Sequence, residues 1–160
     1  MVRTFSTKDG LIPGDFLHAA LDHIAAAEVL FASDPSHYDS AGYLAHIGVE
    51  LLLKAWLLGA AGQFEGIHNL HALYVRLSRE HGAPNLAAEQ TSILEMLDQF
   101  EHLRYPNPLQ PTEIGESDWT DIESLVGFLY EAMPTAILEA MEKAEFGRKG
   151  GRVLMEKKIA

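Results

Sequence analysis

One acid and one base, Glu50 and Lys54, lie four residues apart in a stretch that is otherwise almost entirely apolar. His46 precedes Glu50 by another four residues, so the three side chains would form one row along a helix. A charge inside a helical bundle is costly unless it is paired. Two interpretations stay open. The row is an ion pair at the edge of a bundle, worth about a few tenths of a kcal/mol, or it faces a groove or a subunit interface and takes part in binding.

His68 and His71 form a second candidate set, because they are three residues apart and would share one face of the helix that they begin. Two histidines this close together could both bind one metal ion. A zinc site needs a third protein ligand, however, and this spacing differs from the i, i+4 pair of a metalloprotease helix. The chain has no cysteine. We therefore expect no metal and no other cofactor, and the pair either flanks the helix or contributes to a polar pocket at its start.

Arg104 is the third candidate. It follows an apolar helical segment and is followed by Tyr105 and Pro106. An arginine at a helix C-terminus is favourable to the helix dipole, and the alternative is an arginine held by a proline loop to meet a phosphate or carboxylate. The sequence has no glycine-rich phosphate loop after a strand, no Gly-x-Ser-x-Gly and no cysteine nucleophile. We thus assign no catalytic residue and expect a binding protein rather than an enzyme.

Helices must position these residues, because apolar side chains recur at helical spacing and no stretch alternates as a strand does. The second predicted helix is apolar on two sides, which predicts a central position or a second interface with another subunit. Pro134 should kink the last helix, and Ser117 or Thr120 should cap its start. The sequence predicts an all-α, up-and-down bundle of four to five helices, at about residues 13–32, 39–61, 68–81, 85–103 and 117–146.

The length of 160 residues fits one domain. We divide the chain into a leader at 1–12, the bundle at 13–146 and a basic tail at 147–160. Five of the twelve Lys and Arg residues and one of the 23 Asp and Glu residues follow Gly147, so the remainder carries seven bases and 22 acids.

Because the chain before the basic tail is so acidic, we do not expect it to bind duplex DNA or an anionic membrane surface. The first ten residues show no signal-peptide pattern. The longest apolar run is interrupted by Lys54 and is too short to span a membrane. We expect a cytoplasmic protein.

Three segments, in this order and spacing, resemble the HEPN family: Ile47-Gly48-Val49-Glu50-Leu51-Leu52-Leu53-Lys54, His68-Asn69-Leu70-His71-Ala72-Leu73 and Leu103-Arg104-Tyr105-Pro106. The resemblance covers about residues 16–145. It implies a small prokaryotic helical bundle that stands alone or beside a nucleotidyltransferase. It also implies frequent dimerisation and a groove for RNA, a nucleotide or another small ligand.

Many members of that family are ribonucleases with an arginine followed four to six residues later by a histidine. No histidine follows Arg104 as far as Pro111. Arg76 and His81 match the literal pattern with four residues between them, but they lie at the end of the third predicted helix, away from the expected place. This departure argues against nuclease activity.

Three hypotheses follow. The first is a non-nucleolytic, HEPN-like protein that binds a nucleotide, RNA fragment or other small anion through Arg104, with Lys54 and His68 as helpers. The second is a homodimeric interaction module, joined through the second helix, that partners a nucleotidyltransferase as a toxin–antitoxin pair does. The third is a residual metal-independent ribonuclease that uses an arginine and one of the histidines His68, His71, His81 and His102.

Overall fold

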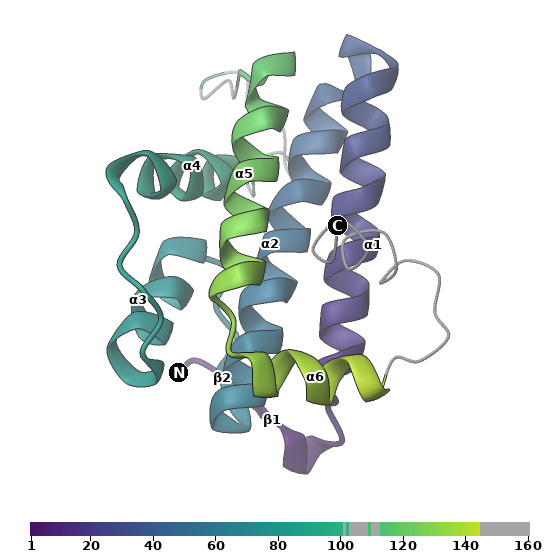
Figure 1. The fold of residues 1–160 in the computed structure, drawn as a ribbon. Coiled ribbons are helices and arrows are strands. Elements are labelled where there is room, and N and C mark those ends of the chain that lie inside the picture. Colours follow the sequence, from purple (N-terminus) through teal and green to yellow (C-terminus); the bar gives the residue numbers. More distant parts are fainter. Residues whose placement is uncertain (101, 103–108, 110–112, 145–160) are drawn as a thin grey trace.

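A computed structural model describes residues 1–100, 102, 109 and 113–144 (Figure 1). The predicted all-α class is confirmed, because the described residues form six α-helices, two three-residue strands and two short 3-10 turns. In Figure 1, α1, α2 and α5 run alongside one another, α6 crosses their lower end, and α3 and α4 lie on the far side of α2 from α1. The helices are α1 (Pro13–Ser33), α2 (Tyr38–Ala61), α3 (Leu70–His81), α4 (Ala88–Gln99), α5 (Glu116–Ala132) and α6 (Thr135–Ala144).

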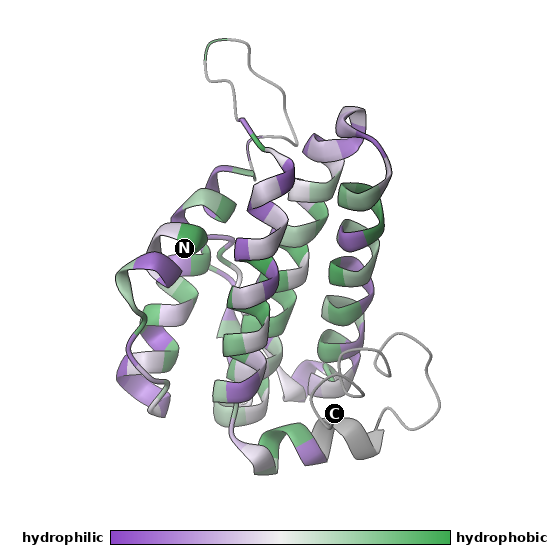
Figure 2. Ribbon diagram, turned by 45° about the horizontal axis from the view of Figure 1, so that its top comes forward, coloured by the Kyte–Doolittle hydropathy of each residue, from purple (hydrophilic) through white to green (hydrophobic). Residues whose placement is uncertain are grey.

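The helix α2 is the centre of the bundle, since it packs against each of the other five helices. Many of its apolar side chains, among them Val49, Leu53 and Trp56, are at most 1 % exposed. Green, hydrophobic residues recur along α1, α2 and α5 in Figure 2. This central position accounts for the two apolar sides of α2 within one chain, so a dimer through α2 stays a prediction. By length and composition alone, Pro13–Ser33 and Pro35–Ala61 would each reach across a membrane. Of their 18-residue apolar windows, 33 % and 61 % are buried inside the bundle.

A close approach of α1 to α2 depends on Gly48. A Cβ atom there would lie 2.6 Å from the Ile24 side chain and 3.2 Å from the Ala20 carbonyl oxygen, both on α1. Both contacts are tighter than normal van der Waals packing allows. The absent side chain therefore lets the two longest helices pack backbone to side chain at the level of Glu50.

An antiparallel pair of short strands, β1 (Thr4–Ser6) and β2 (Gln63–Glu65), joins the first residues of the chain to the end of α2. The expectation that no strand forms was wrong for these residues. Phe5 pairs with Phe64, and the two rings stack with centroids 5.5 Å apart. Three-residue strands are too short to show alternation in the sequence. The pairing follows from burial of Phe64, which also meets Phe16 of α1 edge to face.

Several predicted helix boundaries were wrong near caps and prolines. The predicted third helix starts two residues later than expected because Asn69 caps it, accepting a hydrogen bond from the Ala72 N–H at 2.7 Å. The helix α4 starts at Ala88 rather than near Asn85. Its predicted end at Leu103 lies outside the described residues.

The predicted kink at Pro134 is a complete break between α5 and α6, because Met133 adopts an extended backbone. Neither Ser117 nor Thr120 caps α5. The helix begins at Glu116, and the Gly115 N–H donates to the Asp118 carboxylate at 2.6 Å.

Candidate functional site around Glu50

A buried row of three polar side chains runs along α2. His46, Glu50 and Lys54 are 2 %, 9 % and 5 % exposed, so the row lies inside the bundle rather than at its edge. The Lys54 ammonium donates to Oε1 of Glu50 at 2.5 Å, and Nε2 of His46 lies 3.5 Å from Oε2. Spacing of four residues places the three groups on one helix face, as the sequence predicted. A single carboxylate thus has a nitrogen group against each oxygen.

His68 meets this row from the loop between β2 and α3. Its Nδ1 atom lies 3.1 Å from both Oε1 and Oε2 of Glu50, while half of its side chain is exposed. Lys54 also lies over the Phe64 ring of β2, with Nζ 5.3 Å from the centroid, which is a cation–π distance. The side chain of Glu50 therefore joins α2 to the segment that leads into α3.

The last turn of α4 completes the site. Nδ1 of His46 donates to the Leu97 carbonyl oxygen at 2.8 Å, since a carbonyl can only accept. The Asp98 carboxylate accepts the N–H groups of Leu70 and His71 at 2.6 and 3.3 Å, which satisfies free donors in the first turn of α3. The end of α4 is thereby held against both α2 and the start of α3.

The two carboxylates of the site, the buried Glu50 and the partly buried Asp98, differ in their electrostatics. Burial alone would raise the pKa of Glu50, but the neighbouring His46 ring, the hydrogen bond from Lys54 and the charges of Lys54 and His68 lower it to about 2. Burial raises the pKa of Asp98, against the opposing effect of the N–H groups of Leu70 and His71. Glu50 is accordingly ionised at neutral pH.

An ionised Glu50 determines how the ring of His68 is oriented. A carboxylate accepts hydrogen bonds and donates none, so Nδ1 of His68 carries a hydrogen and donates it to Glu50. The other ring nitrogen, Nε2, is then left for a ligand. A carboxylate that holds an imidazole through one nitrogen and leaves the second available is a recurring arrangement in acid–base and binding sites.

The structure brings together Glu50, Lys54 and His68 from the predicted set, with His71 in the first turn of α3. Arg104 and Tyr105 lie outside the described residues. Sequence reasoning missed Asp98. A signal was present, because an acid in the last turn of a helix is unfavourable to that helix's dipole and so needs another partner.

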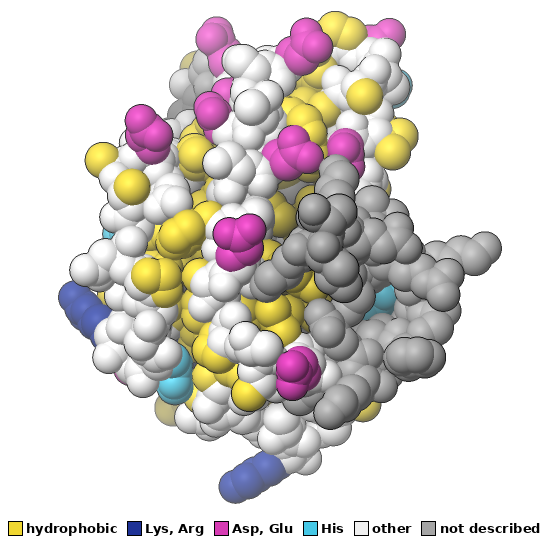
Figure 3. Space-filling model, viewed as in Figure 1, with side chains coloured by type: hydrophobic (Ala, Val, Ile, Leu, Met, Phe, Trp, Pro, Cys, Tyr) yellow, Lys and Arg dark blue, Asp and Glu magenta, His cyan; other side chains and the backbone are white. Residues whose placement is uncertain are grey.

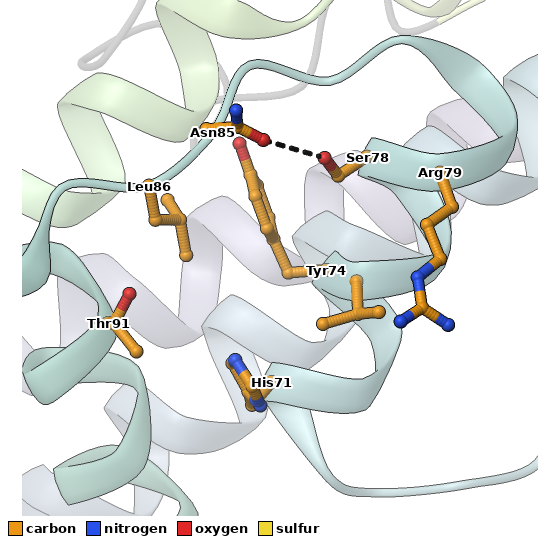
Figure 4. A pocket seen from close by; sticks show the side chains of 8 residues that line it. His71, Tyr74, Ser78, Arg79, Asn85, Leu86 and Thr91 are labelled. Carbon is orange, nitrogen blue, oxygen red and sulfur yellow. Dashed lines mark hydrogen bonds between the residues drawn. The ribbon is translucent and has the colours of Figure 1, made fainter.

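His71 also lines a cavity of about 420 Å³ between α3, the loop after it and α4. Figure 4 shows His71 and Arg79 projecting from α3, with Leu86 and Thr91 on the other side of the cavity. Ser78 donates to Oδ1 of Asn85 at 3.4 Å across its upper edge. The cavity adjoins the Glu50 site through the first turn of α3.

Arg76 and His81, the pair that matches the ribonuclease spacing, both meet Glu80. Nε of Arg76 donates to Oε2 of Glu80 at 3.0 Å, and Nε2 of His81 lies 3.8 Å from the same oxygen. The carboxylate neutralises the arginine, so this pair does not present two free nitrogen groups to a phosphate. Across the described residues no three His, Asp or Glu side chains are grouped to hold a metal ion.

Comparison with known proteins gives one match. No curated protein and no solved structure matches the chain. The family model described as HEPN domain matches residues 14–132, which extend from the first turn of α1 to the end of α5 and include the whole Glu50 site. The chain belongs to the HEPN domain family.

Proposed function

We propose that this HEPN domain binds a phosphate-bearing ligand, a nucleotide or a short RNA segment, at the junction of α2, α3 and α4, in the cytoplasm. The observation that carries the proposal is the setting of His68. Its ring is half exposed, and Nδ1 is held against both oxygens of the buried, ionised Glu50. A ring oriented in this way loses little rotamer freedom on binding. In its neutral form the bare Nε2 accepts a hydrogen bond from a ribose hydroxyl, and in its imidazolium form Nε2–H donates to a phosphate oxygen.

The number of nitrogen groups at this junction supports a phosphate-bearing ligand in an otherwise acidic chain. Lys54 and three histidines surround the Glu50 and Asp98 carboxylates, so nitrogen groups outnumber acids at this junction. Arg104 follows the end of α4 at Gln99 by five residues, which an extended chain spans in about 17 Å at most. We retain Arg104 as a ligand contact and Tyr105 as a side chain that stacks on a base.

Lys54 has a different role from the one the sequence suggested. Its ammonium is held by Glu50 and is 5 % exposed, so it is a positioning residue and not a direct contact. It keeps the carboxylate ionised, and the carboxylate in turn keeps His68 oriented.

Calorimetric titration with ATP, GTP and a short single-stranded RNA tests the proposal. We expect His68→Gln and Arg104→Gln each to weaken binding about tenfold, the size of one lost charge-assisted hydrogen bond. His37→Gln is the matched control, because His37 is exposed on the 3-10 turn before α2. Failure of all three ligands to bind, or equal affinity for the His68 and His37 variants, would contradict the proposal.

The same geometry favours one alternative function, ribonuclease activity with His68 as general base. Nε2 would take the proton of a ribose 2′-hydroxyl, and that oxygen would attack the adjacent phosphorus. The 5′-oxygen would leave and take a proton from water, so that the products are a 2′,3′-cyclic phosphate and a 5′-hydroxyl. Incubation of end-labelled RNA with the protein in the presence of EDTA distinguishes the two functions. Cleavage in EDTA that is lost in His68→Gln would show that the protein is a ribonuclease that uses His68. Binding of the RNA without cleavage would show that it is a binding protein.

A further inference from the structure

A second hollow lies between α4 and α5. It has a volume of about 580 Å³, and its lining combines the apolar side chains Ile93 and Met96 of α4 with the carboxylates of Glu89 and Asp121. Figure 3 shows yellow apolar surface on this face of the molecule, with acidic side chains around it. Ile93 and Met96 are only partly buried although they pack on the core. We refer to this hollow as the α4–α5 groove.

The charge of the two flanking helices has one sign. Together α4 and α5 contain eight Asp and Glu residues and no Lys, Arg or His. Glu89 and Asp121 are exposed and make no ion pair within the part of the chain that the structure describes. Their negative potential is therefore not neutralised by an ion pair with any described residue, and it repels phosphates. The groove cannot serve the phosphate-bearing ligand proposed for the Glu50 site.

We infer that the α4–α5 groove docks a Lys- and Arg-rich amphipathic segment of a partner protein. Aliphatic side chains of the segment would cover Ile93 and Met96, and its basic side chains would pair with Glu89 and Asp121. An apolar stripe flanked by cations is the chemistry that such a groove complements, since amphipathic helices bind apolar grooves through side chains at i, i+3, i+4 and i+7. Methionine adapts its shape to an incoming side chain, which suits a docking surface. The inference is independent of the anion site around Glu50.

The test uses the full chain and a synthetic peptide of about 15 residues with leucines at i, i+3, i+4 and i+7 and lysines elsewhere. Fluorescence anisotropy measures its affinity. We expect the Glu89→Lys, Asp121→Lys double variant to bind at least tenfold more weakly, and Met96→Gln to bind severalfold more weakly. The matched control is Glu131→Lys, Glu139→Lys, which changes the net charge equally at exposed positions away from the groove. Circular dichroism confirms that each variant is folded, and Glu89→Gln, Asp121→Asn replaces the reversal if it is not.

Other results would overturn the inference. Equal loss of affinity in the two charge-reversed proteins would show attraction by the whole acidic surface. If a peptide with alanine in place of leucine bound equally well, the apolar side chains of the groove would make no contribution to the affinity. Self-association seen by light scattering and abolished by the Glu89 and Asp121 reversals would assign the groove to a second copy of this chain. If the double variant Lys157→Gln, Lys158→Gln bound the peptide more tightly, the chain's own basic tail would be the segment that competes for the groove.

Discussion

Replacing Glu50 by glutamine tests the electrostatic account of the site most directly. Glutamine preserves the size of the side chain and can still accept one hydrogen bond, but it removes the negative charge. Lys54 would then be a buried cation without an acid, and His46 and His68 would lose the carboxylate that they face.

The size of the effect follows from the lowered pKa. A carboxyl whose pKa falls from 4.5 to about 2 on folding stabilises the folded state by about 3 kcal/mol when ionised, because one pKa unit corresponds to about 1.4 kcal/mol. Breaking a buried ion pair by removing one partner typically costs about 3–5 kcal/mol, which is the same range. Because the pKa is lower in the folded state, the stabilisation is fully present above about pH 4.5 and is lost as the pH falls from 4.5 toward 2.

Urea denaturation of the wild-type protein and Glu50→Gln, followed by circular dichroism between pH 7 and pH 2.5, measures this difference. We expect the variant to be about 3 kcal/mol less stable at pH 7, and the two proteins to converge below pH 4.5. Glu139→Gln, at an exposed position on α6, should change stability by less than about 0.5 kcal/mol. A difference below about 1 kcal/mol at pH 7, or one that persists unchanged to pH 3, would refute the reasoning.

Two further predictions concern the scaffold of the site. Gly48→Ala should destabilise the protein by about 1–3 kcal/mol by thermal or urea denaturation, because its Cβ has no room against α1. Gly127→Ala on α5, where nothing lies within 4 Å of the new Cβ, should stabilise the protein by up to about 1 kcal/mol. If both variants stabilised the protein, or both destabilised it, the packing argument would be contradicted. Asp98→Ala should cost about 1–2 kcal/mol and raise amide hydrogen exchange at Leu70 and His71, which lose their acceptor. Unchanged exchange at both amides would show that Asp98 does not cap α3.

The sequence predicted the long-range order of the bundle better than its ends. Helical periodicity located α1 and α2 to within one residue, because two helices of more than 20 residues repeat the apolar pattern many times. It misplaced the start of α3 and merged α5 with α6. A helix end is decided by a single hydrogen bond, such as that of Asn69, or by one extended residue before Pro134. Such local events leave little trace in a periodic pattern.

Some contacts of the candidate site could likewise be predicted from the sequence, and others could not. Contacts within one helix could be predicted, since spacing alone places Glu50 beside Lys54. Contacts between elements could not. The bond from His68 to Glu50 joins residues 18 apart, and the bond from His46 to Leu97 joins residues 51 apart through a backbone carbonyl, which has no sequence signature. Arg104 and Tyr105 lie outside the described residues, so their place in the site stays a prediction.

The energetics of the buried row support the binding role that we propose for the site, beside its contribution to stability. Replacing a buried ion pair by well-packed apolar residues is often neutral or stabilising, so the core of α2 would not need Glu50 and Lys54 for folding alone. What apolar residues could not supply is a charged acceptor that orients a half-exposed ring at the surface. Among the described side chains that form ion pairs with Glu50, His68 is the half-exposed one. The buried charges of α2 therefore act where a ligand would meet the protein.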